Sequence, residues 1–227
     1  MTDLDAAPLH GYRGERPADD PRCWPAGLTV TISREAGARG SSIARRVGRK
    51  LGWQVFDQDQ LEYLAQDGRA LDDLDESARE WVGIRLDQLM RARAISDDPE
   101  SIALARVVLA LGANGEAVLI GRGAGYILPS ETTLHVRVVA PLADRVAYMA
   151  QWLRLSDEAA AEAVRQRDVR RSEFLAKHFH QRPDDLYSYD LVLNCGRLGE
   201  ELSAETVAQT AKAKVLALQP TDDEPTA

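Results

Sequence analysis

Five short apolar runs, separated by stretches with helical spacing, constrain the fold of this 227-residue chain more than any other feature. The first run, LTVTI at 28–32, is rich in β-branched residues and leads into a turn that contains glycine. Strands that alternate with helices need crossover connections, which produce a parallel sheet covered by helices. We therefore predict an α/β protein with five parallel strands. These strands are expected at residues 28–32, 53–56, 117–120, 134–139 and 191–193.

The intervening stretches predict the helices and bound the folded part of the chain. Apolar side chains recur every three or four positions in each stretch, and glycines or prolines mark several ends. We expect helices at 43–51, 58–66, 76–94, 99–111, 141–153, 157–179 and 204–218. Residues 1–27 and 219–227 have no apolar period, and we predict that they are disordered tails. Residues 28–218 are then expected to form a single domain.

Composition excludes several classes of protein. The net charge is −8, so a general duplex-binding role is not expected, because phosphate contacts need a basic surface. No run approaches the roughly 20 apolar residues that span a bilayer, and the first 26 residues lack the apolar core of a secretory signal. Cys23 and Cys195 lie too far apart to form a metal motif, and so few cysteines suit a reducing, cytoplasmic location.

The ends of the predicted strands carry the candidate site, because ligands of parallel α/β sheets bind at the carboxyl edge. After the first strand comes SREAGARGSS at 33–42, a short loop with two glycines that leads into a helix. Glycines let backbone amides converge, and the helix dipole favours anions. The loop lacks the G-x-x-x-x-G-K-[ST] pattern, so the residues alone leave two interpretations open, a phosphate site or a tight turn.

Five segments of the sequence, taken together and in this order, resemble the segments of one known protein family. They are ISREAGARGSSIARRVGRKLGWQVFDQDQLEYLA at 32–65, VLIGRGAGYIL at 118–128, LHVRVVAPLADRV at 134–146, RQRDVRRSEFLAKHF at 165–179 and YDLVLNCGRL at 189–198. Over residues 28–218 the chain resembles the cytidylate kinase-like family, which belongs with the P-loop nucleoside monophosphate kinases. The resemblance implies a P-loop NTPase-type sheet of strand order 2-3-1-4-5. It also implies a helical nucleoside monophosphate-binding insertion at 58–112 and a lid at 156–182.

The resemblance also assigns the loop after the first strand to the donor nucleotide, ATP. Its register places Ser42 on a residue that helps to hold Mg²⁺ and Gly40 on the catalytic lysine of cytidylate kinase. That lysine is therefore missing, and either Arg39 or Arg34 is expected to supply positive charge. No aspartate closes the third strand, so nucleotide oxygens and water would complete the magnesium shell. The expected donor-binding residues are Gly37, Ala38, Arg39, Gly40, Ser41 and Ser42.

The second and third strands end in the residues expected to bind the acceptor. Asp57 would contact a sugar or base, although an aspartate at this position is equally typical of a helix N-cap. Arg122 is the only charge in a glycine-rich apolar stretch, and the resemblance assigns it to the acceptor phosphate. Gly123 replaces the sugar-binding aspartate of cytidylate kinases, so the pyrimidine preference is not carried over from the residues. We also assign Arg34 and Asp168 to substrate binding.

An arginine-rich helix follows, and the resemblance identifies it with the lid of monophosphate kinases. Arg167, Asp168 and Arg171 match best, and such arginines neutralise the transferring phosphoryl group and exclude water. We therefore expect Arg39, Arg167 and Arg171 to be catalytic. The alternative is a solvated helix face. His178 and His180 are interpreted as surface or lid residues rather than metal ligands, and Trp152 as a core residue.

These residues together predict an ATP-dependent phosphotransferase that uses Mg²⁺ and acts on a nucleoside monophosphate, with CMP or dCMP favoured by the resemblance. Its partners would be small nucleotides, without nucleic acid or membrane, and the sequence carries no signal of oligomeric state. One rival is a kinase of the same fold with another small-molecule acceptor. Another is a nucleotide sensor with little or no turnover, because the loop lysine is absent. Nucleic-acid binding rests on the arginine helix alone.

Overall fold

The protein is described here by a computed structural model, which covers residues 25, 27–68 and 70–218. Apart from residues 25 and 27, the two predicted tails lie outside these residues. The five strands are β1 (Thr29–Arg34), β2 (Gln54–Phe56), β3 (Ala117–Ile120), β4 (Thr133–Val139) and β5 (Leu191–Asn194). They form one sheet in the order β2-β3-β1-β4-β5, and every neighbouring pair is parallel. The predicted α/β class and strand order are confirmed.

Eight α-helices connect or cover these strands within the described residues. They are α1 (Gly40–Leu51), α2 (Gln58–Asp67), α3 (Glu76–Arg91), α4 (Pro99–Asn114), α5 (Ala124–Ile127), α6 (Leu142–Leu153), α7 (Asp157–Phe179) and α8 (Cys195–Leu218), the last with a kink at Gly199. Side chains begin several of them, as the sequence predicts: Asp57, Asp98 and Ser156 each accept a hydrogen bond from the first turn. No helix among the described residues is long and apolar enough for a membrane crossing.

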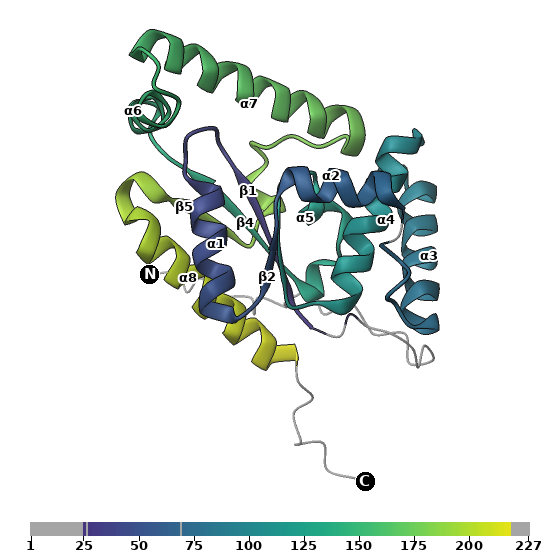
Figure 1. The fold of residues 1–227 in the computed structure, drawn as a ribbon. Coiled ribbons are helices and arrows are strands. Elements are labelled where there is room, and N and C mark those ends of the chain that lie inside the picture. Colours follow the sequence, from purple (N-terminus) through teal and green to yellow (C-terminus); the bar gives the residue numbers. More distant parts are fainter. Residues whose placement is uncertain (1–24, 26, 69, 219–227) are drawn as a thin grey trace, which may run out of the picture.

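The core has two main layers, one on each face of the sheet. Strand side chains alternate between faces, so Val118 and Ile120 pack with the α1 and α8 side, whereas Leu119 packs with α4 and α5. Figure 1 shows α1 and α8 together on one side of the strands, with α2, α4 and α3 on the other. Helices α6 and α7 run above the carboxyl ends of the strands. This arrangement leaves the carboxyl edge of the sheet facing α7.

Candidate functional site

A cavity of about 1170 Å³ lies between the carboxyl edge of the sheet and α7. The ends of β1, β2 and β3, the start of α1 and parts of α6 and α7 line it. It therefore brings together segments that lie more than 100 residues apart in the chain. Of the predicted site residues, Ala38 is buried behind the lining. The others line the cavity: Arg34, Gly37, Arg39, Gly40, Ser41, Ser42, Asp57, Arg122, Arg167, Asp168 and Arg171.

The loop between β1 and α1 is held in one conformation by its glycine and its neighbours. Gly37 has φ +78°, and a methyl group built on it would lie 2.5 Å from the backbone carbonyl oxygen of Arg145 on α6. Arg39 also adopts a left-handed conformation, and α1 starts at the next residue, Gly40, without a side-chain cap. Amides of the first helical turn therefore remain available to an anion at the positive end of the helix dipole.

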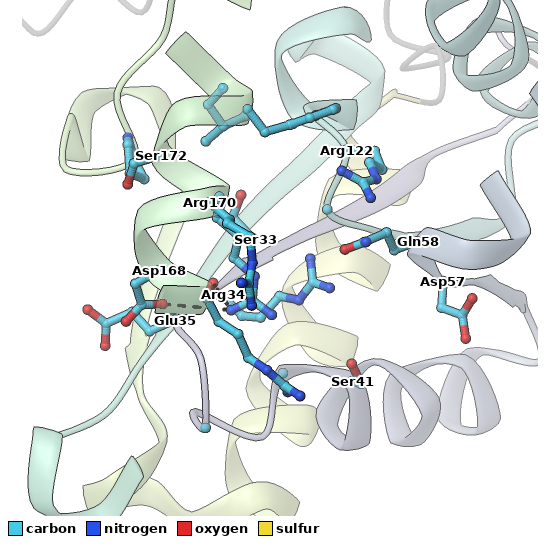
Figure 2. Close-up of a pocket in the computed structure, with 18 of the residues that line it drawn as sticks. Ser33, Arg34, Glu35, Ser41, Asp57, Gln58, Arg122, Asp168, Arg170 and Ser172 are labelled. Atoms are coloured by element: carbon cyan, nitrogen blue, oxygen red, sulfur yellow. Dashed lines mark hydrogen bonds and ion pairs between the residues drawn. The ribbon is translucent and has the colours of Figure 1, made fainter. Parts of the chain in front are cut away.

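Arg34, the last residue of β1, runs along the floor of the cavity. A methyl group built on Gly40 would lie 2.6 Å from Arg34 Cβ, so the side chain crosses directly over the start of α1. Its far end lies at β3, because a methyl group built on Gly121 would be 2.1 Å from Arg34 Nη1. Figure 2 shows Arg34 in the middle of the cavity, with Arg122 and Asp57 on one side and Asp168 on the other.

Arg122 is presented to the same space by an unusual turn. Gly121, Arg122 and Gly123 all have positive φ values, which turn the chain sharply after β3. The Arg122 side chain is 16% exposed, pairs with Glu62 of α2 and lies over the ring of Phe174, 4.4 Å from its centroid. The second predicted acceptor residue, Asp57, has a capping-box hydrogen bond to Gln60, so its N-cap interpretation is confirmed.

Helix α7 is fastened over the loop by Asp168. One carboxylate oxygen accepts a hydrogen bond from the amide of Ala36 at 2.7 Å, and the other contacts Nη1 of Arg145 at 2.6 Å. Arg171, one turn further along α7, donates from Nη1 to the carbonyl oxygen of Arg34 at 3.3 Å. Asp168 therefore positions the helix, and Arg171 reaches the end of β1.

Arg34, Arg122 and Arg171, which we call the arginine cluster, lie close together; Arg122 pairs with Glu62 and Arg171 with Asp168, whereas no ion pair to Arg34 is found among the described residues. Burial, followed by repulsion from Arg171 and Arg122, lowers the pKa of Arg34 to about 9, against a smaller opposite effect of Asp57. Burial also lowers the pKa values of Arg122 and Arg171. The Nε atoms of Arg34 and Arg122 are buried and have no hydrogen-bond partner within the part of the chain that the structure describes. Such a cluster favours binding of an anion, because an anion offsets both the repulsion and the lost hydration.

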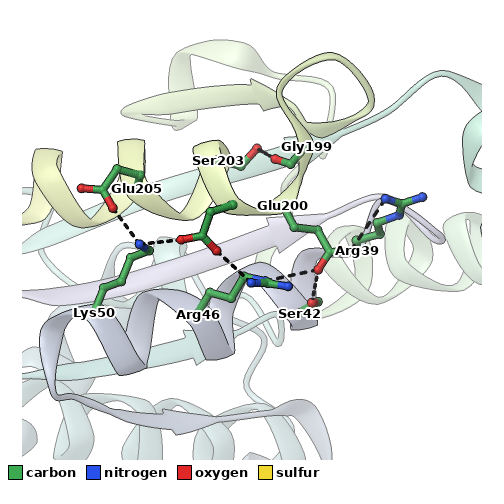
Figure 3. Close-up of polar contacts among 9 residues, drawn as sticks. Arg39, Ser42, Arg46, Lys50, Gly199, Glu200, Ser203 and Glu205 are labelled. Carbon is green, nitrogen blue, oxygen red and sulfur yellow. Dashed lines mark hydrogen bonds and ion pairs between the residues drawn. The ribbon is translucent and has the colours of Figure 1, made fainter.

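Ser42 and Arg39 face a carboxylate from α8. Figure 3 shows Glu200 beside both residues. The Ser42 hydroxyl donates to Glu200, and Nη1 of Arg39 lies 3.7 Å from the same carboxylate, which also pairs with Arg46 at 3.4 Å. Glu200 follows the kink in α8, so a sequence analysis based on strand ends could not have identified it.

The structure adds residues that the sequence analysis missed. Tyr148 and Trp152, one turn apart on α6, line the cavity, with Arg39 and Arg167 respectively over their rings at 5.0 and 5.7 Å. Arg45 and Arg137 also line it, and so does Arg170, which matched the lid less well than Arg167 and Arg171. The prediction that Trp152 belongs to the core is wrong, because the residue is 61% exposed. An aromatic residue on the apolar face of a helix gives no signal that distinguishes a core position from a cavity wall.

Of the two alternatives for His178, surface or lid, the structure excludes the surface. Its ring is buried at the end of α7, and Nδ1 lies 2.7 Å from the hydroxyl of Ser101 on α4. Ser101 in turn donates to Asp98 at 2.7 Å. This contact joins the end of α7 to the start of α4. The described residues contain no group of three or more His, Cys, Asp or Glu side chains suited to a metal ion.

Comparisons with known proteins agree with this architecture. The protein is similar in structure to an uncharacterized protein from Eubacterium ventriosum, with a TM-score of 0.58, 12% identity, and coverage of 82% of this chain and 98% of that one. A shikimate kinase from Acinetobacter baumannii in complex with shikimate is similar at a TM-score of 0.47 and 11% identity, covering 85% of this chain and 97% of that one. The first likeness supports the fold, and the second is too weak to support a conclusion.

Sequence comparison gives one partial match and one broad match. Over 98 residues, or 43% of this chain, the sequence is 34% identical to a uronate isomerase from Corynebacterium glutamicum. The chain spans only 19% of the length of that curated relative, so the similarity is to one part of it. The sequence profile of the cytidylate kinase-like family matches residues 29–197, which include all five strands, the loop after β1 and α7. The chain therefore belongs to the cytidylate kinase-like family.

Proposed function

We propose that this protein is a phosphotransferase that moves the γ-phosphoryl group of ATP to a nucleoside monophosphate, with CMP or dCMP as the preferred acceptors. The observation that carries the proposal is the arginine cluster, which lies in one cavity with the uncapped start of α1. ATP and a nucleoside monophosphate are both negatively charged, so their reaction needs cations between the two phosphate groups and a site that excludes water. The preference for CMP and dCMP rests on the family resemblance, because Gly123 replaces the aspartate expected for the sugar.

The proposed transfer is an in-line displacement. An oxygen of the acceptor phosphate attacks the γ-phosphorus and forms a new P–O bond, while the bond from γ-phosphorus to the β,γ-bridging oxygen breaks. The electron pair of that bond stays on the β-phosphate, which leaves as ADP, and the acceptor becomes a diphosphate. No general base is needed, because the attacking phosphate oxygen is already negative. Arg171 and Arg167 of α7 offset the charge on the moving group.

The two substrates would occupy opposite sides of the arginine cluster. On the donor side, amides of the loop and of the first turn of α1 (37–42) would bind the phosphates of ATP. On the acceptor side, Arg122 would hold the monophosphate and Asp57 would lie near its sugar or base. Arg39 borders the donor side beside Glu200. Asp168 positions α7 through Ala36 and Arg145 and would act on substrate through this contact.

The residues next to Ser42 fit a magnesium ion carried by the nucleotide. Magnesium prefers oxygen ligands and usually keeps water and substrate phosphates in its shell, so few protein ligands are needed. The Ser42 hydroxyl would be such a ligand, and the Glu200 carboxylate, which accepts its hydrogen bond, would orient it. When bound, the ion neutralises charge on the β- and γ-phosphate oxygens.

The direct test is ADP release from ATP and magnesium with each nucleoside monophosphate in turn. We expect turnover with CMP and dCMP, and at most slow background hydrolysis without an acceptor. ADP release with a different small alcohol or phosphate, and none with nucleotides, would indicate the rival kinase of the same fold. ATP binding without ADP release for any acceptor would overturn the proposal in favour of a nucleotide sensor.

A second prediction concerns the base of the donor nucleotide. Trp152 and Tyr148 line the cavity, and stacking of a base on an aromatic ring contributes about 1–3 kcal/mol. We therefore expect Trp152→Ala to weaken ATP binding by about tenfold or more, measured by calorimetry. Tripolyphosphate, which has the same phosphates but no base, provides the matched control and should bind the variant as it binds the wild type. Equal losses for both ligands would contradict a stacking role.

A further inference from the structure

The loop of this protein has no lysine at Gly40, so another cation must contact the donor phosphates if transfer occurs there. Arg39 and Arg34 are the two arginines of the loop, and they point to different places. Arg39 is turned toward α6 and α8: its guanidinium lies over the Tyr148 ring at 5.0 Å and 3.7 Å from the Glu200 carboxylate. Its side chain is 40% exposed. Arg39 therefore already has an ion-pair partner at the edge of the cavity.

Arg34 lies where a side chain from Gly40 would otherwise run. Its Cβ and Cγ atoms would be only 2.6 and 2.8 Å from a methyl group at Gly40, so the two positions compete for one volume. From there its guanidinium extends to Gly121, whose missing side chain leaves room for Nη1. Arg34 thus starts at the end of β1, passes over the first residue of α1 and ends at the turn after β3.

The surroundings of Arg34 lack the negative charge that a buried arginine needs. Its nearest charged neighbours include Arg171 and Arg122, and Asp57 is the carboxylate that favours its charged form. Asp57 also accepts the capping hydrogen bond of α2. Arg34 Nε is buried and has no partner among the described residues. The aliphatic part of Arg34 lies against the start of α1, and its guanidinium, with a free Nε, lies in the same cavity, an arrangement suited to a phosphate bound at the helix amides.

We propose that Arg34 replaces the missing loop lysine and binds the β- and γ-phosphates of the donor from the strand side of the loop. This inference rests on the proposed function, because it assigns a role within the same site. It also explains two glycines by one cause. Gly40 must lack a side chain so that Arg34 can pass, and Gly121 must lack one so that the guanidinium can fit.

The test begins with phosphate affinity, which requires no acceptor. Arg34→Met keeps the length and apolar bulk of the side chain and removes its charge. We expect this variant to bind tripolyphosphate and ATP at least about tenfold more weakly, because charge-assisted hydrogen bonds to phosphate are lost. Arg49→Met is the matched control, since Arg49 is an exposed arginine of α1 outside the cavity lining and its loss changes net charge equally.

Moving the cation to the lysine position separates a binding role from a structural one. Arg34→Gly opens the space over Gly40, because it removes Cβ as well as Cγ, so the double variant Arg34→Gly/Gly40→Lys can place an ammonium there. We expect this double variant to recover at least part of the tripolyphosphate affinity that Arg34→Gly loses. Gly40→Lys alone should gain no affinity and should unfold at lower temperature, because Arg34 still fills the space.

The outcomes separate this inference from the proposed function. Unchanged tripolyphosphate and ATP affinity in Arg34→Met, or no recovery in a folded double variant, would overturn the role of Arg34 even if CMP is phosphorylated. If tripolyphosphate affinity falls in the Arg34 variants and recovers in the double variant, but no acceptor is phosphorylated, the role of Arg34 is supported and the proposed phosphotransferase is overturned. A wild-type protein that binds neither ATP nor tripolyphosphate would overturn both.

Discussion

Arg171→Met is expected to lower kcat for phosphoryl transfer by about a thousandfold while leaving the protein at least as stable as the wild type. Arg171 lies in the cavity and reaches the end of β1. Before substrates bind, its charge is repelled by Arg167, Arg137 and Arg122, with Asp168 as the favourable neighbour. Removing the charge relieves this repulsion and the cost of burying the guanidinium, and it removes the hydrogen bond to Arg34 and the 3.8 Å ion pair with Asp168. During transfer, the positive charge of Arg171 would offset the negative charge on the phosphoryl group, and an uncharged methionine cannot do this.

The measurement is steady-state ADP release together with thermal unfolding of the same preparation. Arg165→Met provides the control, because Arg165 lies on the same helix, is 60% exposed, pairs with Glu162 and does not line the cavity. We expect its kcat to stay within about twofold of the wild type, because surface ion pairs contribute little. If Arg171→Met retains kcat, or loses activity only in proportion to a fall in unfolding temperature, Arg171 has no catalytic role.

Gly37→Ala should damage both the fold and the donor site. A left-handed conformation costs an L-residue about 1–2 kcal/mol, and Gly37 has φ +78°. The added methyl group would also lie 2.5 Å from the carbonyl oxygen and 3.0 Å from the Cα of Arg145. These are backbone atoms of α6, so relief requires movement of the helix itself. We expect the free energy of unfolding to fall by about 2–4 kcal/mol, with loss of measurable ATP binding.

Gly52→Ala isolates the conformational part of this effect. Gly52 ends α1 with φ +74°, and a methyl group there meets nothing within 4 Å. Urea unfolding should therefore show a loss of only about 1–2 kcal/mol for Gly52→Ala, with normal ATP affinity. Equal losses in the two variants would mean that contact between the loop and α6 does not stabilise the site.

Much of the fold could be predicted from the sequence because it depends on local patterns. Alternating apolar runs and helical stretches specify a parallel sheet, and N-cap residues such as Asp57 and Ser156 specify where helices start. Most predicted site residues were identified for a related reason. Parallel strands place their carboxyl ends at one edge, so residues that follow β1, β2 and β3 must lie near one another.

Other parts of the site depend on side-chain direction. Trp152 was predicted to be in the core, but the structure leaves it exposed, and of the surface and lid alternatives for His178 the surface one is wrong because its ring is buried. Each lies on a helix whose orientation over the sheet is set by contacts such as that between Asp168 and Ala36, which are 132 residues apart. Helical periodicity shows on which face of a helix a residue lies, but it does not show what packs against that face.

The sequence by itself determined the α/β class, the strand order implied by the family resemblance, and the absence of a lysine at Gly40. Only the tertiary structure decided which arginine lies over that glycine. Arg34 and Arg39 are both close to it in the chain and carry the same charge. What separates them is that β1 directs one side chain across Gly40 to Gly121, whereas the left-handed turn before α1 directs the other toward Glu200. The arrangement of β1, β3 and α8 around the loop therefore decides which arginine lies over Gly40, and the residues of the loop alone do not.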